Sequence, residues 1–133
     1  MMTTRCVSIL LYDLKHKFLL QQRTDDAPTN SSKWGFFGGS IEEKEEQLQA
    51  VKRETFEELQ YTLKNPQLVH TCTHDFGGIV YVFMEKYDDT QTPVLHEGKS
   101  MGWFSVKDIK NLDMIPYQKD ILLNVVGKLL NTR

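Results

Sequence analysis

Four charged side chains that could do chemistry together, Arg53, Glu54, Glu57 and Glu58, occupy the short segment 53–58. If this segment is helical, the three glutamates at positions i, i+3 and i+4 fall on one arc about 100° wide. Like charges at this spacing repel each other by a few tenths of a kcal/mol per pair, and Arg53 offsets only part of that cost. Converging carboxylate oxygens suit a hard divalent cation such as Mg²⁺. A solvated acidic helix face is the alternative interpretation.

The segment from Glu45 to Leu59 contains no glycine or proline and is rich in strong helix formers, so it predicts a helix. The pair Gly38-Gly39 before it predicts a reversal of the chain. At helical spacing, an apolar stripe should face the core; its members are Leu48, Val51, Thr55 and Leu59. The acidic arc borders this stripe, so the carboxylates are expected beside a buried seam.

The spacing of six polar positions in this segment resembles the Nudix box, the signature of the Nudix (MutT-like) hydrolases. The matching residues are Gly39, Glu45, Arg53, Glu54, Glu57 and Glu58. Four positions depart from the family pattern, namely Phe37, Lys44, Thr55 and Gln60. Neither Thr55 nor Gln60 stands at a position that carries catalytic side-chain chemistry in the family. Gln60 stands where a glycine usually ends the helix, so the C-terminal cap is the feature that this departure affects.

The resemblance implies a role for each matching residue. Glu54, Glu57 and Glu58 are expected to bind Mg²⁺, with Mn²⁺ as a substitute and the Gly39 carbonyl oxygen as a further ligand. Arg53 is expected to orient a glutamate through a salt bridge, and Glu45 to fix the loop to the helix. Bound divalent cations explain why an acidic site would serve an acidic substrate, because they neutralise charge on phosphoryl oxygens.

Two residues outside the box extend the resemblance. Arg23 ends a predicted strand, at a position where Nudix proteins often contact substrate phosphate. Glu97 precedes Gly98 in a polar loop, and MutT-like chains bring such a glutamate over the metal site. Glu97 is therefore expected to be a metal ligand or the general base. The base itself stays open between Glu57 and Glu97, with an ordinary surface role as the alternative for Glu97.

The substrate is less well defined by the sequence. The short chain and its MutT-like flanks favour a nucleoside triphosphate, including damaged or non-standard ones, cleaved to a monophosphate and pyrophosphate. Base recognition is expected from residues near Pro116, which are Tyr117, Gln118 and Asp120. The asparagine that MutT-like enzymes for oxidised guanine carry there is missing. A nucleotide-sugar hydrolase, a dinucleoside-polyphosphate hydrolase and a non-catalytic Nudix-fold sensor remain alternatives.

Composition sets the wider limits. A chain of 133 residues fits a single domain, 1–133. A formal charge of −2 argues against stable nucleic-acid binding through bulk electrostatics, but it allows a nucleotide. The only cysteines, Cys6 and Cys72, form no metal-binding pair, and a site joining Cys72 to His70 and His74 matches no established ligand pattern. With neither a signal-peptide pattern nor a membrane span, a cytoplasmic monomer or homodimer is expected.

The order of predicted elements indicates an α/β fold. Strands are predicted over 6–12, 17–23, 34–37, 61–63, 69–76 and 79–86, with an aromatic strand near Trp103-Phe104. Helices are predicted over 45–59, over 106–111 after the N-cap Ser105, and at the end of the chain. The last helix should pack through Ile121, Leu122, Val125, Val126, Leu129 and Leu130. A mixed sheet between helices, an α/β/α sandwich, follows from this order and is also what the resemblance implies.

Overall fold

The central strand of the sheet is β1, Arg5–Tyr12, which pairs on both of its edges in a computed structural model that describes residues 4–73 and 77–131. One edge pairs in parallel with β6, Ile79–Lys86. The other edge pairs antiparallel with β2, Phe18–Gln22, at the hairpin and with β4, Phe37–Ser40, over Cys6 to Ile9. Parallel and antiparallel pairs in one sheet confirm the predicted mixed sheet.

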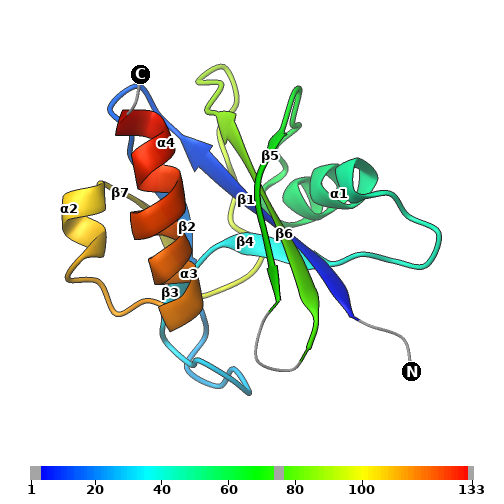
Figure 1. The fold of residues 1–133 in the computed structure, drawn as a ribbon, viewed down its shortest axis with the longest axis horizontal. Helices are drawn as coiled ribbons and strands as arrows, with labels where there is room; N and C mark the ends of the chain where they lie inside the picture. The colour runs from blue at the N-terminus through cyan, green and yellow to red at the C-terminus, as the bar shows by residue number, and fades with distance from the viewer. Residues whose placement is uncertain (1–3, 74–76, 132–133) are drawn as a thin grey trace.

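Three further strands complete the sheet among the described residues. The strand β5, Gln67–Thr73, pairs with β6, while β3, Trp34–Gly35, and β7, Ser100–Phe104, both pair with β2. The helix α1, Gln47–Leu59, lies on one side of the sheet (Figure 1). On the other side lie the short α2, Val106–Ile109, and the C-terminal helical segment α3, Pro116–Ile121, η1, Leu122–Val126, and α4, Gly127–Asn131 (Figure 1). The expected α/β/α sandwich is confirmed.

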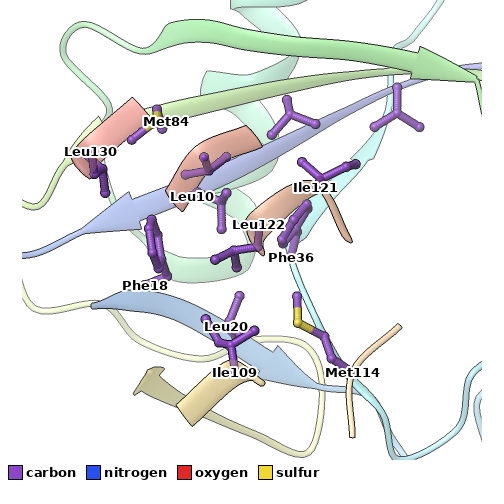
Figure 2. Close-up of a cluster of buried hydrophobic side chains, with 13 residues drawn as sticks. Leu10, Phe18, Leu20, Phe36, Met84, Ile109, Met114, Ile121, Leu122 and Leu130 are labelled. Carbon is purple, nitrogen blue, oxygen red and sulfur yellow. The ribbon is translucent and has the colours of Figure 1, made fainter. Parts of the chain in front are cut away.

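Alternating side chains of β1 divide the core into two parts. Val7, Ile9 and Leu11 point into a cluster that includes Val51 and Leu59 of α1. The intervening Leu10 points into a second cluster with strand residues and the C-terminal helical segment, shown in Figure 2. Because successive strand residues face opposite sides of a sheet, a strand that is apolar at nearly every position must be covered on both faces.

The segment predicted as one strand over 34–37 is divided at Phe36 into β3 and β4. The backbone N–H of Phe36 donates to Gln118 Oε1 at 2.8 Å, and its carbonyl oxygen accepts from Gln21 Nε2 at 3.2 Å. Two side chains thus replace the ladder partners of this residue. The strand predicted over 61–63 is absent, since Tyr61 and Leu63 are buried in a connecting segment instead.

The predicted apolar stripe of α1 is wrong at one residue. Leu48 is 49% exposed, whereas Ala50, Val51 and Thr55 are almost fully buried. The helix begins at Gln47 instead of Glu45, and Glu46 is its N-cap. The buried face of the helix also includes Glu58 and Leu59. The helical pattern predicts Glu58 at the border of the core, but the structure buries its carboxylate.

The C-terminal helical segment packs largely as predicted. Ile121, Leu122, Val126 and Leu130 are buried, and Val125 is partly buried against the same cluster. Leu129, predicted to pack, is 43% exposed instead. The π-helical turn η1 lies in the middle of this segment. A π-helical turn contains one more residue than an α-helical turn, so it rotates the side chains that follow it about the helix axis. A prediction based on the regular α-helical period therefore places Leu129 on the wrong face.

Two non-glycine residues adopt left-handed backbone conformations where the family pattern has glycine. Lys44 has a φ of 67°, and Gln60, the C-cap of α1, has a φ of 52°. The cap is nevertheless formed, because the N–H of Gln60 donates to Phe56 O at 2.8 Å. The departure at Gln60 therefore preserves the hydrogen bonding of the helix end and introduces backbone strain.

Replacing Gln60 by glycine should remove this strain. We expect Gln60→Gly to raise the free energy of unfolding by up to about 1 kcal/mol, since relief of the left-handed conformation outweighs the added entropy of the unfolded chain. Urea unfolding measures the change. As a control, Lys52→Gly on the exposed side of the same helix should lower it by about 1 kcal/mol. Equal destabilisation by both changes would contradict the cap assignment.

Candidate active site

The entry to α1 is built by close contact between β4 and the helix. Gly39 pairs with Val7 of β1, and a Cβ atom at Gly39 would lie 2.4 Å from Cδ of Glu54. A side chain at this position would fit only if the Glu54 carboxylate moved away, so glycine lets the strand pass beside this carboxylate where it now lies. The predicted residues Gly39 and Glu54 are therefore neighbours in the structure.

Arg53 connects the loop before α1 to the helix. Its Nε and Nη2 atoms donate to the two carboxylate oxygens of Glu45 at 2.8 and 2.9 Å, a bidentate pair. Nη2 also donates to the carbonyl oxygen of Ser40 at 3.0 Å. The hydrogen bonds that Arg53 donates to Glu45 lower the pKa of Glu45 to about 2, and its hydrogen bonds to Glu45 and Glu54 raise the pKa of Arg53 itself. Arg53 and Glu45 thus lie where a role in fixing the loop to the helix requires them.

The same guanidinium also contacts the helical glutamates. Arg53 Nη1 lies 2.9 Å from Glu54 Oε1 and 3.2 Å from Glu57 Oε2. The Glu57 side chain is 57% exposed, while that of Glu54 is 16% exposed. Burial raises the pKa of Glu54, although Arg53 opposes the shift. The acidic arc therefore has one exposed member and one mostly buried member that share a cation.

The third glutamate, Glu58, has a different environment. It is 1% exposed, and its Oε1 atom accepts a hydrogen bond from the backbone N–H of Gly38 at 3.0 Å. Its Oε2 atom is buried and has no hydrogen-bond partner in the described part of the chain. Burial, followed by the charges of Glu97 and Glu54, raises the pKa of Glu58 to about 9. A buried carboxylate with one unpaired oxygen is costly unless a cation or a proton compensates it.

Glu97 reaches this region because the loop before it is attached to the end of α1. The N–H of Val94 donates to Leu59 O at 2.8 Å, and that of His96 donates to Glu58 O at 2.9 Å. These bonds use carbonyl groups that the end of a helix leaves unpaired. Residues that are far apart in sequence are thereby brought together, and the charge of Glu97 acts on Glu58.

The glutamates do not form a preorganised metal-binding site among the described residues. Within residues 4–73 and 77–131, no three acidic, histidine or cysteine side chains converge closely enough to hold a metal ion. Glu54 and Glu57 are turned toward Arg53, and Glu58 is bonded to Gly38. Side-chain rotation would be needed for a shared ion. The unpaired oxygen of Glu58 and the oxygen-only donor set nevertheless fit a hard cation.

A cavity of about 500 Å³ is lined by Glu97 and by Gly39, the neighbour of Glu54, whereas the three helical glutamates are not among its lining residues. Three of the residues expected to bind substrate line it, namely Arg23, Tyr117 and Gln118, together with Gly39 and Glu97. Asp120 is not among the lining residues and accepts a hydrogen bond from Asn124 Nδ2 at 2.6 Å. The cavity has the size of a small-molecule site.

Several residues that line the cavity are not predicted from the sequence. Ser8 and Cys6 come from β1, Gln21 from β2, and Phe36 from the break between β3 and β4. Ser8 and Gln21 are buried polar residues on strands. Polar residues within an apolar run are the one sequence feature that would have identified them, because a buried polar group needs a specific partner.

Two minor expectations concern cysteine and membrane sites. Cys6 and Cys72 are free thiols, and burial raises the pKa of both. His74 lies outside the described residues. No helix in the described residues has the length and apolar character needed to cross a bilayer.

Comparisons with known proteins agree with this geometry. The Nudix domain model matches residues 2–125. The fold is similar to the E. coli ORF135 protein, with 26% identity over 100% of this chain and 94% of that one and a TM-score of 0.78. It is also similar to a MutT protein from Methanosarcina mazei, with 23% identity, coverage of 89% and 88%, and a TM-score of 0.75.

An Ap4A hydrolase from C. elegans is similar in fold, with 20% identity, coverage of 96% and 99%, and a TM-score of 0.78. A comparison with curated protein sequences gives no significant match. The family model covers most of the chain, and the sheet, the loop–helix unit and the acidic residues occur together in one fold. This chain belongs to the Nudix family of hydrolases.

Proposed function

We propose that this Nudix hydrolase is a Mg²⁺-dependent pyrophosphohydrolase that cleaves a nucleoside triphosphate to a monophosphate and pyrophosphate. The observation that carries the proposal is the buried, half-unpaired carboxylate of Glu58 beside Glu54 and Glu97. At neutral pH such a group keeps a proton unless a cation replaces it, because its pKa is raised to about 9, and among the described residues Arg53 is bonded to other carboxylates. A divalent cation would displace that proton and supply the compensating charge.

The residues that would hold the ion are Glu54, Glu57 and Glu58, with the Gly39 carbonyl oxygen. The chemistry supplied by a bound ion is neutralisation of phosphoryl charge and a lowered pKa for water. Arg53 would keep the loop and the helix in register, because it bonds Glu45, Ser40 and Glu54 at once. The guanidinium charge of Arg53 would then be used in bonds to protein groups and would not contact the substrate.

The cavity supports a nucleotide as substrate. Arg23 is a cation on its wall, and its Nε atom is oriented by a hydrogen bond to Thr29 O at 3.0 Å. The remaining guanidinium donors suit a phosphate. Tyr117 offers an aromatic ring, and Gln118 is fixed by bonds to Phe36 N and to the Tyr117 hydroxyl. Tyr117 and Gln118 would therefore contact the base, with Asp120 outside the cavity as a secondary candidate.

Of the two candidates for the general base, geometry favours Glu97. Glu97 lines the cavity, whereas the Glu57 carboxylate is held by Arg53 on the exposed side of the helix. A general base must reach the water that it deprotonates, and a side chain on the cavity wall can do so.

The proposal is tested by turnover with Mg²⁺ across nucleoside triphosphates, diadenosine polyphosphates and nucleotide sugars. The triphosphates tested should include standard and damaged bases. We expect release of pyrophosphate from at least one of them. Preferred turnover of a nucleotide sugar or a dinucleoside polyphosphate would replace the substrate class and keep the site. Nucleotide binding without turnover of any compound would identify a sensor.

Replacing Glu58 by a neutral residue should raise the stability of the metal-free protein and lower its turnover. In chelator, Glu58→Gln should raise the free energy of unfolding at neutral pH by on the order of 2 kcal/mol. An unfolded glutamate loses its proton near 4.5 and the folded one near 9, so the folded state binds the extra proton between these values. The advantage of the variant should therefore grow as pH rises through this range, by up to about 1.4 kcal/mol per unit.

In the presence of Mg²⁺, the wild type should become more stable than Glu58→Gln. An ion that binds only the native state raises the melting temperature of the wild type, and the gain should vanish in Glu58→Gln. Turnover of this variant and of Glu57→Gln should fall at least about 10²-fold when Mg²⁺ is limiting. Near wild-type turnover in both variants would move the metal away from this helix.

The role of Glu97 is tested separately. Glu97→Gln should lower kcat by about 10²–10⁴-fold with little change in nucleotide affinity, as expected for a lost general base. Glu43→Gln, an exposed glutamate in the loop before α1, is the matched control and should change kcat less than about threefold. If Glu97→Gln behaves like this control, the base assignment passes to Glu57.

A further inference from the structure

The loop that carries Glu97 is held by backbone hydrogen bonds on both sides of this residue. Before it, the N–H of His96 donates to Glu58 O of α1 at 2.9 Å. After it, the N–H of Lys99 donates to Gln22 O of β2 at 2.7 Å. Only Glu97 and Gly98 lie between these anchors, so the backbone of these two residues decides where the carboxylate points.

Gly98 is exposed and has a left-handed conformation, with a φ of 82°, but the direction that a side chain would take is blocked. A Cβ atom there would lie 2.7 Å from Gln21 Oε1 and 2.9 Å from the carbonyl oxygen of Gln22. The second atom belongs to the backbone of β2, which is paired with β3 and β7 and cannot move aside cheaply. Glycine is therefore required here by both conformation and space.

Gln21 is the side chain against which this glycine packs. It is only 9% exposed, and its Nε2 atom donates to Phe36 O at 3.2 Å. Its backbone pairs with Gly35 of β3 and Met101 of β7. Pairing on both edges of β2 fixes the backbone of Gln21, and the bond to Phe36 O orients its side chain, so Gly98 lies against a held group; both residues line the cavity together with Glu97.

We propose that Gln21 and Gly98 form a positioning contact that holds the Glu97 carboxylate beside Glu58. Gln21 acts as the fixed surface and Gly98 as the residue that permits the close approach. This inference rests on the proposed role of Glu97 in hydrolysis. Gln21 and Gly98 are positioning residues, because they act through Glu97 instead of through the reacting atoms.

The first test compares two glycines of similar conformation. Gly98→Ala should lower kcat by about 10²-fold with little change in KM, since a displacement of about 1 Å can cost this much. Gly77→Ala is the matched control, because Gly77 has a φ of 80° and a Cβ atom added there would meet no atom of the described residues within 4 Å. Equal effects of the two changes on kcat would overturn the proposal.

A double-mutant cycle distinguishes positioning from general damage. In a Glu97→Gln background, Gly98→Ala and Gln21→Ala should each change kcat less than about twofold, because the group that they position is already lost. Each should lower kcat clearly when Glu97 is present. The same fold loss in both backgrounds would show that Gln21 and Gly98 act independently of Glu97, which contradicts the proposal.

A measurement without substrate or metal keeps this inference separate from the proposed function. Amide hydrogen exchange of His96 and Lys99 should accelerate at least about tenfold in Gly98→Ala, with the core amide of Ile9 unchanged. This result would support the contact even if the wild type hydrolysed no nucleotide, an outcome that rejects only the proposed function. Unchanged exchange at both amides would overturn the contact itself.

Discussion

The burial of the Glu58 carboxylate is the constraint on which the site depends. The residue lies on the core-facing side of α1, next to Thr55 and Leu59, where its Oε1 atom accepts a hydrogen bond from the Gly38 amide while no donor among the described residues reaches its Oε2 atom. An ionised carboxylate in such a place costs several kcal/mol unless it is paired. This bond joins β4 to the helix, and Glu97, in the loop attached to the end of α1, adds a further negative charge. At neutral pH Glu58 therefore keeps its proton, and a cation that displaced this proton would compensate the ionised carboxylate.

Arg53 shows how the remaining charges are divided. This one guanidinium is bonded to Glu45, Glu54, Glu57 and the Ser40 carbonyl oxygen. It stabilises the loop–helix unit, in which the bidentate pair with Glu45 is the tightest link. The buried carboxylate of Glu58 accepts its hydrogen bond from the Gly38 backbone instead. Arg53 therefore serves the loop–helix unit, and none of its hydrogen bonds in the described part of the chain reaches Glu58.

The sequence predicts the acidic helix and the mixed sheet because their signals are local, whereas the salt bridge of Arg53 and the role of Glu45 are implied only by the resemblance to the Nudix box. Helical spacing places Glu54, Glu57 and Glu58 on one arc, and apolar runs identify β1, β2 and β6. It cannot predict that Glu58 is buried and Leu48 exposed, since this depends on how the helix rotates against β4. The break at Phe36 also escapes prediction, because its cause is contact with Gln21 and Gln118 from distant segments. Likewise, the position of Gly98 against β2 is set by tertiary packing alone.

Compensation of the buried Glu58 carboxylate by a divalent cation can be tested directly by crystallography with Mn²⁺. Anomalous scattering locates this ion without assumptions about its ligands. We predict an anomalous peak within bonding distance of Glu58, with the carboxylate of Glu54 or Glu57 turned from Arg53 toward the ion. A crystal in which Mn²⁺ binds elsewhere, while Glu58 keeps its bond to Gly38 and its unpaired oxygen, would contradict this role for Glu58.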